Sequence, residues 1–369
     1  MNKGILFFAD KLPPLVGGME LHADYFIRYF KNHHKYRLLG VITKNTHDLD
    51  QLILDESLLH IHLKDLPNII EPTFVFFNSG RWIEELSIIR QLYPKSKFIY
   101  RTGGNEIIKA PLINKKISDH KARQKYWVES LNATIDTLIT NSSFTENRLN
   151  HLGITCPFLR CVGGVNLEDL TPALNVQKSK RLKLFCAARF VAYKNHILLI
   201  ELIDSLIKRG HILELNLAGD GPLRENIQQL VKSKKLENSV KLLGTLENRS
   251  VCQEIANSDI YIQLSCDYLT RVEGGSYIHS EGMGRSILEA ISAGTFVIAG
   301  HSGALSEIVT PDRGLLLNLN DIDEMVKRIE RVFLQRPLRC SPYHGYCWSE
   351  VFKKYELLME DYIENTPCH

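Results

Sequence analysis

Two carboxylates flank a glycine-rich stretch in the last third of the chain, where residues 280–294 read SEGMGRSILEAISAG. Gly282 and Gly284 allow backbone N–H groups to approach an anion closely. The helix expected to begin near Arg285 adds the positive end of its dipole. The stretch therefore favours an anion site, and the alternative is an ordinary loop and helix with solvated charges.

The second carboxylate of this stretch, Glu289, lies about one turn into the helix, too far along to cap it. There it can accept two hydrogen bonds from vicinal hydroxyls such as those of ribose, each contributing roughly 1.5–3 kcal/mol. The alternative is an i,i+4 pair with Arg285, which contributes only about 0.2–0.5 kcal/mol. The helix is otherwise apolar on most sides, so we expect it to be buried and Glu289 to need a partner.

Two cations follow a predicted strand in the segment FCAARFVAYKN, residues 185–195. Arg189 can bind a diphosphate through paired hydrogen bonds, and Lys194 supplies a mobile point charge. Surface cations are common, so the pair taken alone is equally compatible with a solvated surface.

Two glycine-containing turns follow other predicted strands. In KLPPLVGGMELH, Gly17 and Gly18 would let backbone amides approach an anion at the start of the next helix, although, taken alone, an ordinary strand-to-helix turn explains them better. In LAGDGP, Gly219 and Gly221 permit an unusual backbone conformation. We expect this second turn to be structural.

The elements that must position these residues alternate between short β-rich runs and longer helical patterns. Such alternation predicts an α/β fold with parallel sheets covered by helices. The pattern occurs twice, separated by the polar stretch at 171–181, and we expect domains at 1–172 and 173–345. A helix within 346–369 is expected to return towards the first domain. Ligands of open parallel sheets bind beyond the carboxyl ends of the strands, where these cations and glycines lie.

The composition restricts the class of protein. The chain has 369 residues and a formal net charge of +3, too close to neutral to indicate a nucleic-acid partner. Eight cysteines without metal-ligand spacing indicate reduced thiols. No apolar run is long enough to span a membrane and no signal peptide is recognisable, so we expect a cytoplasmic protein.

Two further charged features of the sequence are a pair of Asp-x-Asp tripeptides and a basic stretch. Asp-x-Asp tripeptides at 48–50 and 321–323 precede helical patterns and are expected to cap helices, so we predict no obligatory metal and no cofactor. The basic stretch at 114–127 would suit an acceptor carried on an anionic lipid, or peripheral contact with an anionic membrane at its inner face. Its alternative is a solvated helix face.

Several of these motifs occur in an order that resembles the family 4 retaining glycosyltransferases, which have the GT-B fold of two Rossmann-like domains facing a cleft. EGMGRSILEA is similar to their E-x7-E motif, and AARFVAYKN to their diphosphate-binding segment. PPLVGGMELH resembles their N-terminal glycine loop, and TNSSFTENRL, LAGDGP and GALSEIV match further segments. One E-x7-E alone would be weak, but the ordered series covers nearly the whole chain.

The resemblance implies roles for four charged residues. Arg189 and Lys194 resemble the cations that hold the donor diphosphate and stabilise it as it leaves. Glu289 is similar to the glutamate that binds the nucleotide ribose, and Glu281 to the one that contacts the transferred sugar.

The resemblance also implies backbone contacts to phosphate. In the C-terminal domain these would come from Gly284, Arg285 and Ser286. Gly17 and Gly18 would approach the same diphosphate from the other domain when the cleft closes.

The sequence departs from the family pattern in two places. Where many members have a histidine that touches the donor, FIYRTGGNE offers Arg101 and Asn105 instead. The segment 266–280 is about twelve residues longer than expected and creates a second E-x7-E between Glu273 and Glu281. We reject that register because the residues after Glu273 lack helical periodicity. We interpret the insertion as a lid or an acceptor contact, with surface elaboration as the alternative.

The predicted activity is transfer of a sugar from a UDP- or GDP-sugar to a hydroxyl of a saccharide or lipid-linked acceptor, with retention of configuration. The alternatives are a sugar-nucleotide epimerase or phosphorylase on the same fold, and an inert sugar-nucleotide-binding subunit. Arg189, Lys194, Glu281 and Glu289 are all present, which disfavours the inert subunit. Nothing in the sequence selects the base or the sugar.

Overall fold

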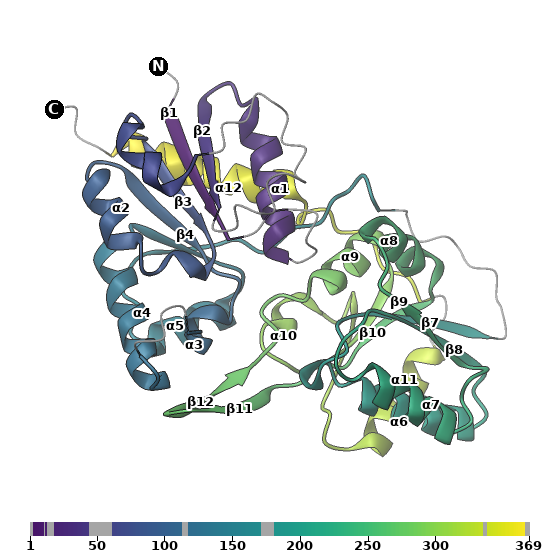
Figure 1. Ribbon diagram of the computed structural model, residues 1–369. Helices are drawn as coiled ribbons and strands as arrows, with labels where there is room; N and C mark the ends of the chain where they lie inside the picture. The colour runs from purple at the N-terminus through teal and green to yellow at the C-terminus, as the bar shows by residue number, and fades with distance from the viewer. Residues whose placement is uncertain are drawn as a thin grey trace. The chain divides into compact units, whose positions relative to one another are not determined.

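The computed structural model describes residues 3–10, 12, 18–43, 61–112, 117–170, 181–334 and 338–365, and Figure 1 shows their arrangement into helices and strands. The chain divides into two compact units, and each is described by itself. Unit 1 comprises Met1–Val162, Thr270–Tyr277 and Trp348–His369, and unit 2 comprises Gly163–Leu269 and Ile278–Cys347. The domain boundary expected after residue 172 lies outside the described residues and stays a prediction.

Unit 1 is built on a six-stranded parallel sheet with the strand order β2-β1-β3-β4-β5-β6. Its strands are β1 (Lys3–Ala9), β2 (Tyr36–Thr43), β3 (Phe74–Asn78), β4 (Lys97–Arg101), β5 (Thr137–Thr140) and β6 (Phe158–Arg160). Its helices are α1 (Gly18–Lys31), α2 (Leu86–Leu92), α3 (Glu106–Lys109), α4 (His120–Thr134), α5 (Ser143–Leu152) and α12 (Trp348–Glu364). Short 3₁₀ turns occur at η2 (Leu63–Asn68) and η3 (Gly80–Trp82).

The interior strand β1 is apolar and buried from Ile5 to Ala9 because both of its faces are covered. Ile5 and Phe7 belong to a buried cluster with residues of α1 and α12, whereas Leu6 and Phe8 belong to a second cluster with residues of α2 and α4. Alternate side chains of a strand point to opposite faces, so a continuous apolar run fits a sheet between two helical layers.

Helix α12 completes the layer that α1 begins. The ring of Phe26 lies against that of Phe352, with centroids 6.0 Å apart, and His22 Nε2 lies 3.0 Å from the Tyr355 hydroxyl. Burial, assisted by the charge of Arg101, holds the pKa of His22 well below its ordinary value, so the ring is neutral. The last described helix of the chain is therefore part of the unit 1 core.

We expect Tyr355→Phe to lower the free energy of unfolding by about 1–3 kcal/mol, because the substitution removes a buried hydrogen-bond partner of His22. Urea denaturation of the two proteins measures this difference. Tyr126→Phe on α4, where the tyrosine is 36% exposed, is the matched control and should change little. Equal stability of Tyr355→Phe and wild type would contradict the importance of this contact.

The insertion at 266–280 forms a two-stranded hairpin of β11 (Tyr268–Val272) and β12 (Gly275–His279). Its tip, Thr270–Tyr277, is grouped with unit 1. There the backbone N–H of His120 donates to the carbonyl of Glu273 at 3.0 Å, and the rings of His120 and Tyr277 lie 5.8 Å apart. The tip is thus packed against the start of α4.

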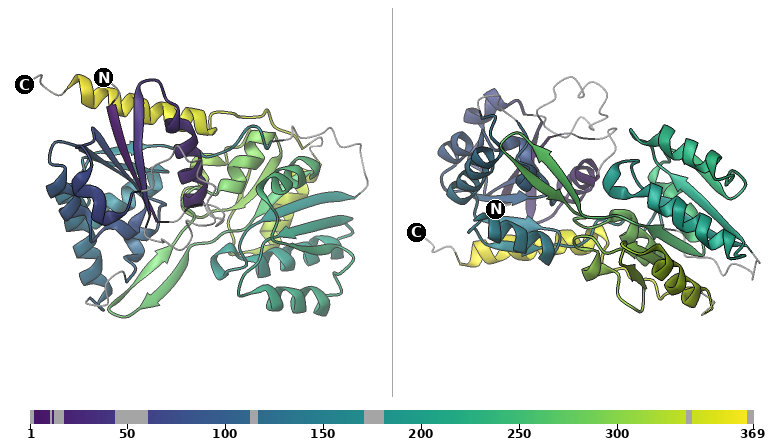
Figure 2. Two further views of the ribbon diagram at one scale, coloured as in Figure 1. Left: turned by 45° about the horizontal axis from the view of Figure 1, so that its top comes forward. Right: turned by 90° about the horizontal axis from the view of Figure 1, so that it is seen from below.

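Unit 2 contains the second six-stranded parallel sheet, with the order β14-β13-β10-β7-β8-β9. Its strands are β7 (Leu182–Ala187), β8 (Leu213–Ala218), β9 (Val240–Gly244), β10 (Ile260–Gln263), β13 (Phe296–Gly300) and β14 (Gly314–Leu317). Its helices, seen from two directions in Figure 2, are α6 (His196–Lys208), α7 (Arg224–Ser233), α8 (Asn248–Asn257), α9 (Arg285–Ala293), α10 (Leu305–Ile308) and α11 (Ile322–Phe333).

The structure describes one of the two Asp-x-Asp tripeptides that were predicted to cap helices. Asp321 caps α11 as expected, since its carboxylate accepts from the backbone N–H of Asp323 at 2.9 Å and of Glu324 at 3.2 Å. The other tripeptide, at 48–50, lies outside the described residues.

Within the described chain, no helix combines the length and the apolar character that crossing a bilayer requires.

Candidate functional site

The order of strands in unit 2 reverses between β7 and β10. From β7 the chain continues to β8 and β9 on one side, and from β10 to β13 and β14 on the other. Ligands of open parallel sheets bind at the carboxyl ends of the strands where the order reverses. We call this place, at the carboxyl ends of β7 and β10, the switch point. Lys194 follows β7 in the short 3₁₀ turn η4 (Ala192–Lys194), and Gln263 ends β10, so both lie there.

An ion pair occupies the switch point. Lys194 Nζ lies 2.5 Å from Glu281 Oε2, and both side chains are largely shielded, with exposed fractions of 16% and 14%. Burial alone would raise the pKa of Glu281, but Lys194 and the Ser265 hydroxyl outweigh it, and the pKa is lowered. The first glutamate of the predicted motif is therefore ionised and joined to the predicted diphosphate-binding lysine.

Gln263, which the sequence analysis did not single out, connects this ion pair to its surroundings. Its Nε2 donates to Glu281 at 3.1 Å and to the Ser265 hydroxyl at 2.9 Å, and Ser265 donates to the same carboxylate oxygen at 2.9 Å. Its Oε1 accepts from the hydroxyls of Tyr261 at 2.9 Å and Ser286 at 3.3 Å. One fully buried amide thus joins the carboxylate to the first turn of α9.

The first turn of α9 is fixed by backbone and side-chain contacts. Gly284 precedes the helix with φ 70°, and a Cβ at this position would approach Leu305 to 2.9 Å, so a glycine is required there. The Ser286 hydroxyl also lies 2.6 Å from the Tyr261 hydroxyl and 3.1 Å from the carbonyl oxygen of Ala187. The first N–H groups of a helix have no acceptor within it, so the amides of Arg285 and Ser286 are suited to bind an anion.

The second glutamate of the motif, Glu289, is buried beside a cation. Arg285 Nε lies 3.5 Å from Glu289 Oε1, so the i,i+4 contact considered for the sequence is present. Burial raises the pKa of Glu289 to about 7, against the lowering effects of Arg285 and of a hydrogen bond from Asn248, while the charge of Asp169 raises it further. Arg285 therefore compensates the carboxylate only in part.

We expect Glu289→Gln to stabilise the protein at neutral and alkaline pH by about 1–3 kcal/mol. The pKa of Glu289 is raised from 4.5 to about 7, so the folded protein binds this proton more tightly than the unfolded chain. The free energy of unfolding therefore falls as pH rises from about 4.5 to about 7, and glutamine removes this loss. Denaturation at pH 5 and pH 8 measures it.

Glu225→Gln, an exposed glutamate in the first turn of α7, is the control for the change in charge. It should show the same difference from wild type at both pH values. A Glu289→Gln effect that does not grow between pH 5 and pH 8 would contradict the burial of an ionisable carboxylate.

Arg189 follows β7 directly but does not join the ion pair. Its side chain is exposed and has no hydrogen-bond or ion-pair partner among the described residues. Its backbone is held by the LAGDGP turn, because a Cβ at Gly219 would lie 2.1 Å from the carbonyl oxygen of Ala188, and the N–H of Phe190 donates to Asp220 at 2.9 Å. The turn is structural, as expected, and it leaves the Arg189 guanidinium available to a ligand.

The predicted site residues of unit 1 have different surroundings. Gly17 lies outside the described residues, whereas Gly18 is the exposed first residue of α1 with open space around it. Arg101 ends β4 buried, with Nη1 3.0 Å from the sulfur of Met19, so its guanidinium supports the start of α1. Asn105 is partly exposed and precedes α3. Their contact with a donor stays a prediction.

The basic stretch at 114–127 presents less positive charge than its sequence indicates. Arg123 is buried and donates to the backbone carbonyls of Ala110 and Ile117, at 2.8 and 3.1 Å. Lys125 lies 3.8 Å from Glu129, and residues 113–116 lie outside the described residues. Arg123 is therefore not a membrane contact, and peripheral binding through the rest of the stretch stays a prediction.

No metal centre is apparent in the part of the chain that the structure describes, because no group of three or more histidine, cysteine, aspartate or glutamate side chains gathers there. This arrangement does not test the metal requirement of the reaction. The prediction of no obligatory metal therefore stays a prediction.

The C-terminal half of the sequence matches a known protein family. Residues 171–342, which contain the ion pair and both glutamates, match the family described as Glycosyl transferases group 1. The match covers slightly less than half of the chain and shows what this part of it is similar to. Among curated proteins, the chain is 28% identical over 255 residues to the GDP-mannose-dependent monoacylated alpha-(1-6)-phosphatidylinositol monomannoside mannosyltransferase of Corynebacterium glutamicum. That match covers 66% of this chain but 62% of the relative, less than two thirds of its length.

Solved structures share the fold of this chain. A glycosyltransferase from Rickettsia africae superposes with a TM-score of 0.75 at 18% identity, covering 99% of this chain and 100% of that one. Anabaena HepE, in complex with UDP and glucose, superposes with a TM-score of 0.73 at 16% identity, covering 98% and 100%. At such identities the likeness concerns the fold, and the predicted GT-B fold is confirmed.

Proposed function

We propose that this group 1 glycosyltransferase transfers a sugar from a nucleotide-diphosphate sugar to an acceptor hydroxyl. The observation that carries the proposal is the Lys194–Glu281 ion pair at the switch point, joined through Gln263 to the first turn of α9. A cation, an ionised carboxylate and a helix N-terminus are there combined in one shielded network. These groups suit a diphosphate and the hydroxyls of a sugar.

The cations have the chemistry that departure of a nucleoside diphosphate requires. Negative charge grows on the leaving phosphate as the bond to the sugar breaks, and positioned donors stabilise that charge. Lys194 and the exposed Arg189 would supply the side-chain donors, and the amides of Gly284, Arg285 and Ser286 the backbone donors. Glu281, held ionised, would bind a hydroxyl of the transferred sugar.

The proposed stereochemical course is retention. It follows from the family resemblance, with the acceptor hydroxyl attacking on the face from which the diphosphate departs. NMR of the anomeric proton in the first product formed would distinguish retention from inversion.

Two similar proteins suggest two different nucleotide bases for the donor, guanine and uracil. The Corynebacterium relative is named as GDP-mannose-dependent, and Anabaena HepE was crystallised with UDP and glucose. We propose a UDP- or GDP-hexose or N-acetylhexosamine donor and a saccharide or lipid-linked acceptor. A thermal-shift screen of nucleotide sugars would identify the donor without knowledge of the acceptor.

The place of action is proposed to be the cytoplasm, or the cytoplasmic face of a membrane if the acceptor is lipid-linked. The name of the Corynebacterium relative, which acts on a phosphatidylinositol mannoside, motivates the lipid-linked alternative.

An epimerase or phosphorylase on the same fold is the second candidate. Release of free nucleoside diphosphate only when an acceptor is present would exclude both enzymes. An inert subunit would bind the nucleotide sugar without turnover under any acceptor condition.

We expect Lys194→Ala to lower turnover by about two to three orders of magnitude, because one charged donor to the leaving group is lost. Nucleoside diphosphate release in the presence of acceptor measures the effect. Arg189→Ala should have a similar consequence without disturbing Glu281, with which Arg189 makes no contact. Lys183→Ala, an exposed lysine of the same strand β7, is the control. Near-normal rates for both Lys194→Ala and Arg189→Ala would overturn the diphosphate assignment.

Glu289→Gln should weaken binding of the nucleoside diphosphate tenfold or more in calorimetry, because neutral glutamine forms weaker hydrogen bonds to ribose hydroxyls. The same variant is expected to be more stable than wild type at pH 8, so lost affinity could not be attributed to unfolding. Unchanged affinity would instead assign Glu289 to the helix contact with Arg285 alone.

A further inference from the structure

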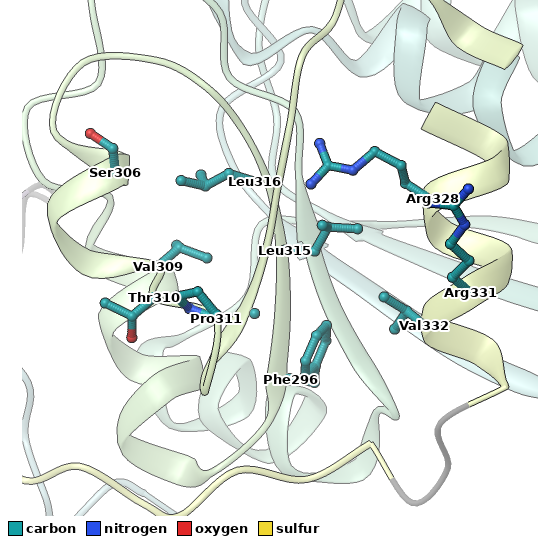
Figure 3. A pocket seen from close by; sticks show the side chains of 11 residues that line it. Phe296, Ser306, Val309, Thr310, Pro311, Leu315, Leu316, Arg328, Arg331 and Val332 are labelled. Atoms are coloured by element: carbon teal, nitrogen blue, oxygen red, sulfur yellow. The ribbon is translucent and has the colours of Figure 1, made fainter. Parts of the chain in front are cut away.

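A second concave site lies in unit 2, away from the ion pair. A pocket of about 540 Å³ opens between α10, the edge strand β14 and α11 (Figure 3). Phe296 and Gly314, which line it, are the first residues of β13 and β14, so the pocket lies toward the amino ends of these strands. The proposed donor site lies beyond the carboxyl ends. The pocket is therefore separate from that site.

The lining of the pocket is amphipathic. Its apolar part comes from Phe296, Val309, Leu315, Leu316 and Val332, and several of these side chains are only partly buried by the protein. Its volume is within the range of roughly 300–1,000 Å³ that small-molecule sites occupy. Partly covered apolar side chains in a concavity of this size favour a ligand with an apolar body.

Two arginines of α11 line the same pocket. In Figure 3 the guanidinium of Arg328 extends from α11 toward β14, above Leu315 in this view, and Arg331 runs along α11. Neither has a hydrogen-bond or ion-pair partner among the described residues, and none of the described lining residues is acidic. Two guanidinium groups that line one pocket, without a carboxylate among its described lining residues, suit a phosphate.

Of the three acidic residues of α11, Asp323 and Glu330 pair with another segment, and the exposed Glu324 makes no ion pair with Arg328 or Arg331 among the described residues. Asp323 lies 3.1 Å from one Nη of Arg209, and Glu330 lies 3.5 Å from the other. Both carboxylates therefore pair with the segment after α6. Arg328 and Arg331 are left as a local positive charge at the mouth of an apolar pocket.

We propose that this pocket binds a phosphate-bearing amphiphile, with the phosphate on Arg328 and Arg331 and the apolar body against Phe296, Val309 and Leu316. Such chemistry has two sources, a soluble phosphate ester with an apolar group and the headgroup region of an anionic lipid. The proposal does not depend on the glycosyltransferase activity, because it concerns different residues at the other end of the strands.

The first experiment is calorimetric titration of the full chain with octyl phosphate below its micelle concentration. Saturable binding is expected. Inorganic phosphate and octanol should each bind at least tenfold more weakly, because phosphate can contact only the arginines and octanol chiefly the apolar lining. Absence of saturable octyl phosphate binding would overturn the proposal, as would equal affinity for inorganic phosphate.

The matched variants are the double substitution Arg328→Gln with Arg331→Gln, and Lys327→Gln, which removes an exposed charge from the same helix. The double variant should lose at least tenfold in octyl phosphate affinity while Lys327→Gln stays within twofold of wild type. Circular dichroism checks folding, and unchanged affinity for UDP or GDP would show that the donor site is intact. Equal losses of octyl phosphate affinity in the double variant and in Lys327→Gln would attribute the binding to nonspecific charge and overturn the proposal.

A vesicle arm distinguishes the two sources. Sedimentation with phosphatidylcholine vesicles containing phosphatidic acid, lost in the double variant and retained by Lys327→Gln, would support the lipid. Octyl phosphate binding that depends on both arginines, without vesicle binding by wild type, would support a soluble phosphate ester.

Discussion

The buried amide of Gln263 is the constraint on which the arrangement of the candidate site depends. A side chain without solvent access must satisfy its donors and acceptor within the protein, and this one does so with Glu281, Ser265, Tyr261 and Ser286. These partners come from β10 and the residues just after it, from the loop before α9 and from α9 itself. An apolar residue in place of Gln263 would leave the Glu281 carboxylate and the α9 turn without a common anchor.

The fold was largely readable from the sequence because its strands are apolar on both faces. Runs such as GILFFA and TFVFFN form interior strands of the unit 1 sheet, and LKLFCA and TFVIAG form interior strands of the unit 2 sheet. The strands β5, β6 and β14 are harder to predict from the sequence. Each has three or four residues, too few to show a period, and its place is set by tertiary pairing with a longer neighbour.

The site was predictable in its charged members and not in the polar residues that hold them. Lys194 and Glu281 stand out by type and spacing, whereas Gln263 resembles an ordinary polar residue at a strand end until the sheet places it beneath Glu281. Burial was also invisible at Arg101, whose guanidinium contacts Met19 inside unit 1. For Glu289 the sequence suggested burial but could not supply Asn248 and Asp169, which come from distant segments.

The hairpin formed by β11 and β12 has a consequence for the evolution of the chain. The backbone passes from one unit to the other four times, after Val162, Leu269, Tyr277 and Cys347, and the segment that matches the family ends short of the last crossing. A gene fragment limited to residues 171–342 would carry the hairpin tip without α4, on which it packs. An exchange of unit 2 between relatives would preserve this contact only if the tip and the start of α4 were inherited together.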